Sequence, residues 1–106
     1  MLVFREETFG PVAPIRVVSD FETALTEAAD DRYGLAATVL TSDMGHAQAA
    51  WRTLPVGTVK INAVFGVAPG GASEPRRASG SGFGFGQELL DEMTAMKVVY
   101  WSPPGG

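Results

Sequence analysis

The sequence contains no cysteine among its 106 residues. This absence excludes disulfide bonds, thiolate zinc sites, cysteine redox motifs and a cysteine nucleophile within the chain. Long apolar runs are also missing, because the longest stretches, such as residues 35–40, are far shorter than the ~20 residues that span a bilayer. The opening residues become charged after Phe4, so no secretory signal peptide is expected. We therefore expect no membrane partner and a cytoplasmic location.

Positive charge is scarce as well. Eight Lys and Arg residues face twelve Asp and Glu residues, which gives a net charge of −4. The only local basic cluster, Arg76-Arg77, is too short to form a basic surface, so nucleic acid is excluded as an expected partner. An apolar content of 45% is that of a globular protein, and the length is enough for one small domain over residues 1–106.

The first half of the chain alternates strand and helix patterns. Residues 12–18 are β-branched and apolar and predict a strand, in which Pro14 indicates an edge position or a bulge. Ser19 and Glu22 have the spacing of a capping box and predict the start of a helix. Gly34 is suited to a left-handed C-cap at the end of that helix.

Residues 35–41 predict a buried strand, and Ser42 is expected to cap a second helix that Pro55 stops. Asp43 would then lie at the positive end of the helix dipole. Residues 58–62 predict a third strand. Four residues form the predicted apolar stripe of the second helix: Met44, Ala47, Trp51 and Leu54. Strand, helix, strand, helix, strand over residues 1–62 predicts an α/β layer of parallel strands.

The regular pattern stops at residues 63–86, a glycine-rich loop without a clear period. Long loops of this kind are typical of functional or disordered segments. Residues 87–101 predict a short amphipathic helix and a final strand at Lys97–Trp101, followed by a tail at 102–106. Methionines at helical spacing, Met93 and Met96 among them, are interpreted as core residues.

Four motifs occur in one order along the chain: EETFGPV at residues 6–12, YGLAA at 33–37, GTVKIN at 57–62 and SGSG at 79–82. A short helix pattern and KVV at 97–99 follow the last. In order and spacing they resemble the end of the aldehyde dehydrogenase family over nearly the whole chain. One such motif is unspecific, whereas four in register are specific. The extended form EETFGPVAP is similar to semialdehyde-oxidising members.

The glycine-rich loop departs from the family pattern. Pro69-Gly70-Gly71 lacks the family's phenylalanine, and seven residues separate Gly71 from Ser79 where the family has three. Phe83-Gly84 replaces the usual arginine and acidic residue after the SGSG motif. This loop lies beside the substrate entrance in the family, so the substrate class is not assigned from it.

The resemblance implies a partial aldehyde dehydrogenase catalytic domain whose final strand serves oligomerisation. The complete enzyme would oxidise an aldehyde to a carboxylic acid with NAD or NADP, through a thioester on a cysteine. In the family that cysteine, the general-base glutamate and the Rossmann domain all precede the EETFGPV motif. The chain is therefore expected to be a carboxyl-terminal fragment that is inactive alone and binds no cofactor tightly.

Three site residues follow from the resemblance. Glu7 matches the glutamate that accepts hydrogen bonds from the nicotinamide ribose hydroxyls, and Phe9 matches the aromatic residue beside the nicotinamide ring. Phe65 follows Asn62 in the loop that lines the family's aldehyde pocket, and Asn62 itself is expected to hold the backbone. Without the resemblance, Glu7 reads as a solvated glutamate and Phe9 as a core side chain.

Two further patterns do not carry chemistry. The run GSGFGFG at residues 80–86 lacks the third glycine that a GxGxxG dinucleotide loop requires. His46 is the only histidine and has no cysteine ligands to join it, so no metal site is expected.

Two interpretations remain open. The chain is either a piece of an NAD(P)-dependent aldehyde dehydrogenase or a non-catalytic binding or assembly module derived from that fold. In both cases we expect self-association or a complementary aldehyde dehydrogenase chain as partner.

Overall fold

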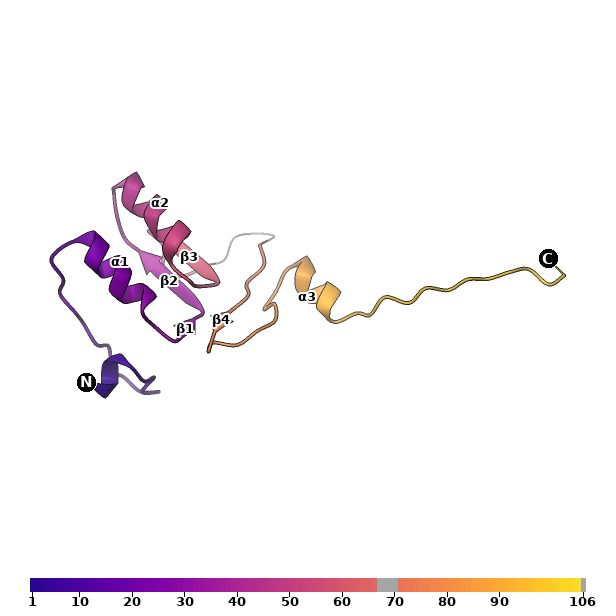
Figure 1. Ribbon diagram of the computed structural model, residues 1–106, viewed down its shortest axis with the longest axis horizontal. Coiled ribbons are helices and arrows are strands. Elements are labelled where there is room, and N and C mark those ends of the chain that lie inside the picture. The colour runs from indigo at the N-terminus through magenta and orange to yellow at the C-terminus, as the bar shows by residue number, and fades with distance from the viewer. Residues whose placement is uncertain (67–70, 106) are drawn as a thin grey trace.

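The computed structural model describes residues 1–66 and 71–105, and its ordered centre is a pair of parallel strands with two helices beside it (Figure 1). In chain order the elements are η1 (Leu2–Phe4), α1 (Phe21–Ala29), β1 (Tyr33–Gly34), β2 (Ala36–Val39), α2 (Met44–Thr53), β3 (Thr58–Ile61), β4 (Arg76–Arg77) and α3 (Gln87–Glu92). None of the helices in the described ranges is long and apolar enough to cross a membrane.

Strands β2 and β3 pair in parallel, from Ala36 opposite Thr58 to Val39 opposite Ile61. Helix α2 makes the crossover between them, which is the connection that parallel strands require. The predicted α/β class is thus confirmed, and the two central strands lie where the apolar runs placed them.

The core is small and lies between the helices and the sheet. Among the described residues the buried apolar side chains are Leu25, Ala47, Ala50 and Leu54. From the sheet, Ala37, Val39 and Val59 pack against this cluster. Leu35 and Leu40, at the two ends of β2, are 57% and 72% exposed. The prediction of a buried strand over residues 35–41 was therefore wrong, because only the Ala37 and Val39 face of β2 is covered by the described chain.

The helix caps lie one residue later than predicted. Asp20, not Ser19, caps α1, since its carboxylate accepts from the Thr23 amide at 2.8 Å. The Ser19 hydroxyl instead donates to Asp20 at 2.6 Å. Asp43, not Ser42, caps α2. In both cases an ionised acceptor lies at the positive end of the helix dipole, which favours aspartate over serine there.

The end of α1 also differs from the prediction. Asp30 is the C-cap, with a φ of −83°, and its amide donates to Thr26 and Glu27. Gly34 lies in β1 and is buried, not in a left-handed cap. Its lack of a side chain serves close packing, because a Cβ there would lie 2.8 Å from the Pro55 carbonyl oxygen.

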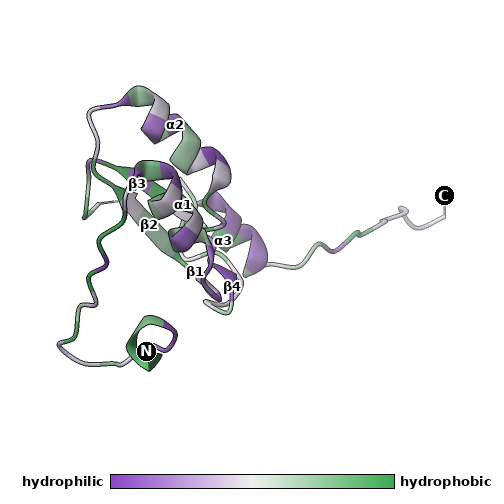
Figure 2. Ribbon diagram, turned by 60° about the vertical axis from the view of Figure 1, so that its left-hand side comes forward, coloured by the Kyte–Doolittle hydropathy of each residue, from purple (hydrophilic) through white to green (hydrophobic). Residues whose placement is uncertain are grey.

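Two predicted strands do not form. Residues 12–18 and Lys97–Trp101 pair with no strand in the described part of the chain. Figure 2 shows the apolar colouring of the extended stretch that precedes α1. A β-prone pattern becomes a strand only when a partner edge supplies hydrogen bonds.

The carboxyl-terminal third packs against the rest of the chain less than predicted. Helix α3 ends at Glu92, and Met93 and Met96 are 75% and 95% exposed, so their interpretation as core residues was wrong. Met44 and Trp51, at 66% and 48% exposed, are not core residues either. The chain beyond α3 runs out away from the rest of the molecule (Figure 1).

Candidate functional site

A groove of about 590 Å³ lies between the amino-terminal segment and the strand end of the molecule. Residues 3–7 line one side, and Asp31 with residues 33–37 line the other. The lining is completed by Pro14, Ala28, Val56 and Ser79. The volume falls within the range of small-molecule and cofactor sites, which is about 300–1,000 Å³.

Glu7 is the predicted cofactor residue that the structure places at this groove. Its side chain is exposed, so the carboxylate is free to accept hydrogen bonds from a bound molecule. An ionised carboxylate that receives two neighbouring hydroxyl groups makes charge-assisted bonds, about twice as strong as neutral ones. Glu7 thus gives the groove an acceptor position suited to a ribose, beside apolar walls.

Phe9 and Phe65 are not among the residues that line this groove. Phe9 has a left-handed φ of 49° and is 89% exposed. The turn that follows it is made by Gly10 and Pro11, since the Val12 amide donates to the Gly10 carbonyl at 2.8 Å. This turn presents Phe9 outward instead of packing it in a core.

Phe65 lies on the loop after β3 and is 90% exposed. Two side chains from the sheet hold the backbone just before it. Lys60 Nζ donates to the Val64 carbonyl at 3.1 Å, and Thr38 Oγ1 donates to the Ala63 carbonyl at 3.3 Å. The loop therefore leaves the carboxyl ends of the parallel strands, where α/β folds hold their ligands.

Asn62 ends β3 with a left-handed φ of 54°. Its side-chain amide bonds twice to the backbone of Thr41: Oδ1 accepts from the Thr41 amide and Nδ2 donates to the Thr41 carbonyl, each at 2.8 Å. The expectation that Asn62 holds backbone agrees with this geometry. The side chain takes the place of a peptide group between the two strand ends.

The glycine-rich segment contributes Ser79 to the groove. Its strand β4 pairs antiparallel with β1, so that Tyr33 lies opposite Arg77 and Gly34 opposite Arg76. The Gly34 amide donates to Ser79 Oγ at 3.0 Å. The prediction of a loop without regular structure over residues 63–86 missed this pairing. A two-residue strand is too short to produce a periodic pattern.

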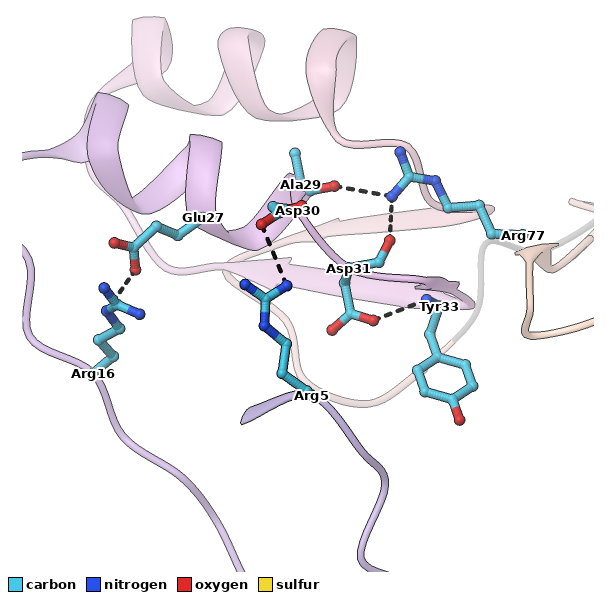
Figure 3. A network of polar contacts seen from close by, with 8 residues as sticks. All are labelled: Arg5, Arg16, Glu27, Ala29, Asp30, Asp31, Tyr33 and Arg77. Carbon is cyan, nitrogen blue, oxygen red and sulfur yellow. Dashed lines mark hydrogen bonds and ion pairs between the residues drawn. The ribbon is translucent and has the colours of Figure 1, made fainter. Parts of the chain in front are cut away.

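Three arginines from separate parts of the chain reach the end of α1 (Figure 3). Arg5 pairs with Asp30 at 3.5 Å, and Arg16 pairs with Glu27 at 2.8 Å. The Arg5 pair is solvent-exposed and the Arg16 pair is partly so, and ion pairs near the surface contribute only about 0–1 kcal/mol each. The amino-terminal segment that carries Glu7 is thus held loosely within this chain. Arg77 Nη1 donates to the main-chain carbonyls of Ala29 and Asp31.

His46 and the two capping aspartates have surroundings that fit a role in the fold and not in a site. The His46 ring stacks on Phe21 with centroids 4.0 Å apart and planes 9° from parallel. The described residues contain no group of three or more His, Cys, Asp or Glu side chains that could hold a metal ion.

Hydrogen bonds from the His46 and Gly45 amides, with attraction to His46, lower the pKa of Asp43. The Ser19 hydroxyl and the Thr23 amide likewise lower the pKa of Asp20.

Comparison with known proteins identifies relatives of this chain. Residues 1–99 match the aldehyde dehydrogenase family. The succinate semialdehyde dehydrogenase [NAD(P)+] of Escherichia coli (strain K12) is 43% identical, and the alignment covers 94% of this chain and 22% of that protein.

Solved structures give the same relationship. The lactaldehyde dehydrogenase of Escherichia coli superposes with a TM-score of 0.84 and 35% identity, over 95% of this chain and 21% of that one. A betaine aldehyde dehydrogenase of Staphylococcus aureus, solved in complex with NAD+, gives a TM-score of 0.76 and 35% identity, over 83% of this chain and 18% of that one. The chain thus spans about a fifth of the length of these relatives.

Proposed function

The chain belongs to the aldehyde dehydrogenase family, and from that premise we propose that it forms part of an NAD(P)-dependent enzyme that oxidises an aldehyde to a carboxylic acid. The match over residues 1–99 is the observation that carries this proposal. Because the chain spans only about a fifth of its relatives, the activity proposed is that of the complete enzyme. The motifs of this chain resemble those of the carboxyl-terminal portion of such an enzyme.

The cofactor residues we propose are Glu7 and Phe9. Glu7 lines a groove of about 590 Å³ and offers a free carboxylate for the ribose hydroxyls, so this part of the chain fits one end of a dinucleotide. The chain has no GxGxxG loop for the phosphates. When bound, NAD(P) accepts a hydride from the substrate. Phe9 offers an exposed aromatic face and a rigid turn beside it, which supports a packing role against the nicotinamide ring.

On the substrate side we propose that Phe65 contributes to the aldehyde pocket. Its loop starts from the carboxyl ends of the parallel strands and is held by Asn62 and Lys60. A semialdehyde is the substrate class that we favour. The EETFGPVAP motif and the 43% identity to a succinate semialdehyde dehydrogenase support that choice.

The purified chain alone is expected to oxidise no aldehyde. It contains no cysteine, and no other residue here is placed to form a thioester-type intermediate. It is also expected to bind NAD only weakly, because Glu7 and Phe9 contact one end of the dinucleotide. Calorimetry and absorbance at 340 nm on the pure chain check both points. A micromolar dissociation constant, or steady formation of NADH from an aldehyde, would contradict them.

A chimera tests the proposed roles directly. Residues 1–106 replace the corresponding segment of the Escherichia coli succinate semialdehyde dehydrogenase, and NAD(P)H formation is measured. We expect an active chimera in which E7Q raises the KM for the nucleotide by about tenfold or more, since it weakens charge-assisted bonds. E22Q, at an exposed glutamate that does not line the groove, is the matched control and should change the KM little. A folded chimera that binds NAD(P) but oxidises no aldehyde would favour the non-catalytic module instead.

A further inference from the structure

The glycine-rich segment, residues 71–86 here, is longer than its counterpart in the family pattern, yet its first part is bound closely to the sheet. The Gly57 position shows how closely, because a Cβ there would lie 1.6 Å from the Glu74 carbonyl oxygen. Strand β4 pairs with β1, and the Gly84 amide donates back to the Ser73 carbonyl at 2.7 Å. A further contact is therefore needed to keep β4 of this longer segment paired with β1 in one register.

We propose that Arg77 is the positioning residue that latches this segment to the carboxyl end of α1. Its Nη1 donates to the Ala29 carbonyl at 2.9 Å and also to the Asp31 carbonyl (Figure 3). These acceptors lie 48 and 46 residues earlier in the chain. Two distant segments are thus joined by one side chain.

The chemistry of the acceptors explains why a cation lies there. The last carbonyls of a helix have no partner within the helix, and they form the negative end of its dipole. In α1 the Asp30 amide satisfies Thr26 and Glu27, whereas Ala29 receives the guanidinium of Arg77.

Arg77 also adopts a left-handed φ of 55°, which is uncommon for a residue other than glycine. That backbone directs the chain into the next two contacts. The Ala78 amide donates to the Arg32 carbonyl at 2.9 Å, and Ser79 Oγ accepts from the Gly34 amide at 3.0 Å. Arg77 thereby fixes the residue pair, Gly34 and Ser79, that lines the groove opposite Glu7.

The consequence for the cofactor rests on the proposed function, whereas the latch itself is independent of it. If Glu7 faces a ribose, then Arg77 sets the width of the groove through Ser79 without touching the nucleotide.

Arg76 provides the internal comparison. It lies beside Arg77 in β4, and none of the hydrogen bonds or ion pairs among residues 1–66 and 71–105 involves its side chain.

The test is hydrogen exchange resolved to single amides on the full 106-residue chain. In R77M, which keeps an unbranched side chain but removes the guanidinium with its charge and donors, exchange at Ala78 and Gly34 should accelerate by about tenfold or more. The Leu54 amide, which donates to the Ala50 carbonyl at the end of α2, should be unchanged. R77K should restore exchange to within about threefold of the original chain, because both bonds come from one nitrogen that an ammonium can replace. R76M should have no effect.

Unchanged exchange at Ala78 and Gly34 in R77M overturns the proposal, as does acceleration that spreads equally to α2. Should R77M fail to fold, the unmodified chain still provides a test. Nuclear Overhauser contacts between the Arg77 guanidinium protons and residues 29–32 are expected, and their absence in the folded chain contradicts the latch. No nucleotide or aldehyde is present, so this result is separate from the E7Q measurement on the chimera.

Discussion

At the scale of single residues, Asn62 shows how one side chain ends a strand and begins a functional loop. It combines a left-handed backbone with two hydrogen bonds to Thr41, both at 2.8 Å. Asparagine suits the position because it tolerates left-handed φ better than most residues and carries both a donor and an acceptor. The direction of the loop toward Phe65 therefore depends on a polar side chain and not on apolar packing.

Substitutions at Asn62 should separate the two contributions. N62G keeps the backbone conformation but loses both hydrogen bonds, and should cost about 1–2 kcal/mol in the free energy of unfolding. N62A loses the same bonds and adds the strain of a left-handed alanine, about 1 kcal/mol more. Urea unfolding measures both, with N62D, which keeps the acceptor only, as the intermediate case. Equal stability of the glycine and alanine variants would contradict the strain argument.

At the scale of elements, helix α2 begins on a charged cap. Asp43 Oδ1 accepts from the Gly45 amide at 2.6 Å and from the His46 amide at 3.1 Å. These bonds, that from His46 first, hold the pKa of Asp43 below its usual value of 3.8. Because the folded pKa is the lower one, the stabilisation is complete above the unfolded value and is lost as the pH falls through the folded value.

We therefore expect the melting temperature to fall as the pH is lowered below about 4, and to fall less in D43N, whose cap carries no titratable group. Asp20 caps α1 in the same manner, and its pKa is lowered by Ser19 and Thr23. The double variant D20N/D43N should lose the two contributions additively, since the caps belong to different helices. Thermal melts by circular dichroism between pH 2 and 7 measure this. An unchanged acid dependence in the double variant would show that the caps are not its source.

At the scale of the whole molecule, the chain is extended and leaves apolar surface uncovered. Its radius of gyration is 20.3 Å, against roughly 13 Å for a compact domain of this length. Val98, Val99, Tyr100 and Trp101 are between 73% and 90% exposed. Both β2 and β3 have one unpaired edge in the described structure, and such edges are templates for pairing with another chain.

We expect the chain to self-associate or to require a complementary chain. Sedimentation at micromolar concentration should give a mass well above 11.2 kDa. Addition of the remaining part of a related enzyme should replace self-association by a defined complex, because it supplies partners for the same edges. A single species of 11.2 kDa with a cooperative melt above about 50 °C would show instead an autonomous domain.

The elements that the sequence predicted correctly are those set by interactions between residues close together in the chain. Apolar periodicity predicted α1, α2, β2 and β3, since each pattern reports a local backbone preference and one buried face. The same reasoning failed at residues 12–18 and at Lys97–Trp101. Their composition favours a strand, but the described part of the chain supplies them with no partner edge.

The candidate site divides in the same way. The motif around Glu7 and Phe9 could be recognised from the sequence because its residues are adjacent, whereas their roles in cofactor binding stay a prediction. No local pattern could show that Arg77 reaches Ala29, or that Asn62 bonds to Thr41, because these partners are 48 and 21 residues apart.

The sequence alone thus determined the family, the α/β class and the positions of the central helices and strands. The tertiary structure decided which strands pair, which face of β2 is covered and which groove Glu7 lines. The physical reason is that propensity and periodicity are properties of neighbouring residues. Pairing and burial depend instead on surfaces that the fold brings together from distant parts of the chain.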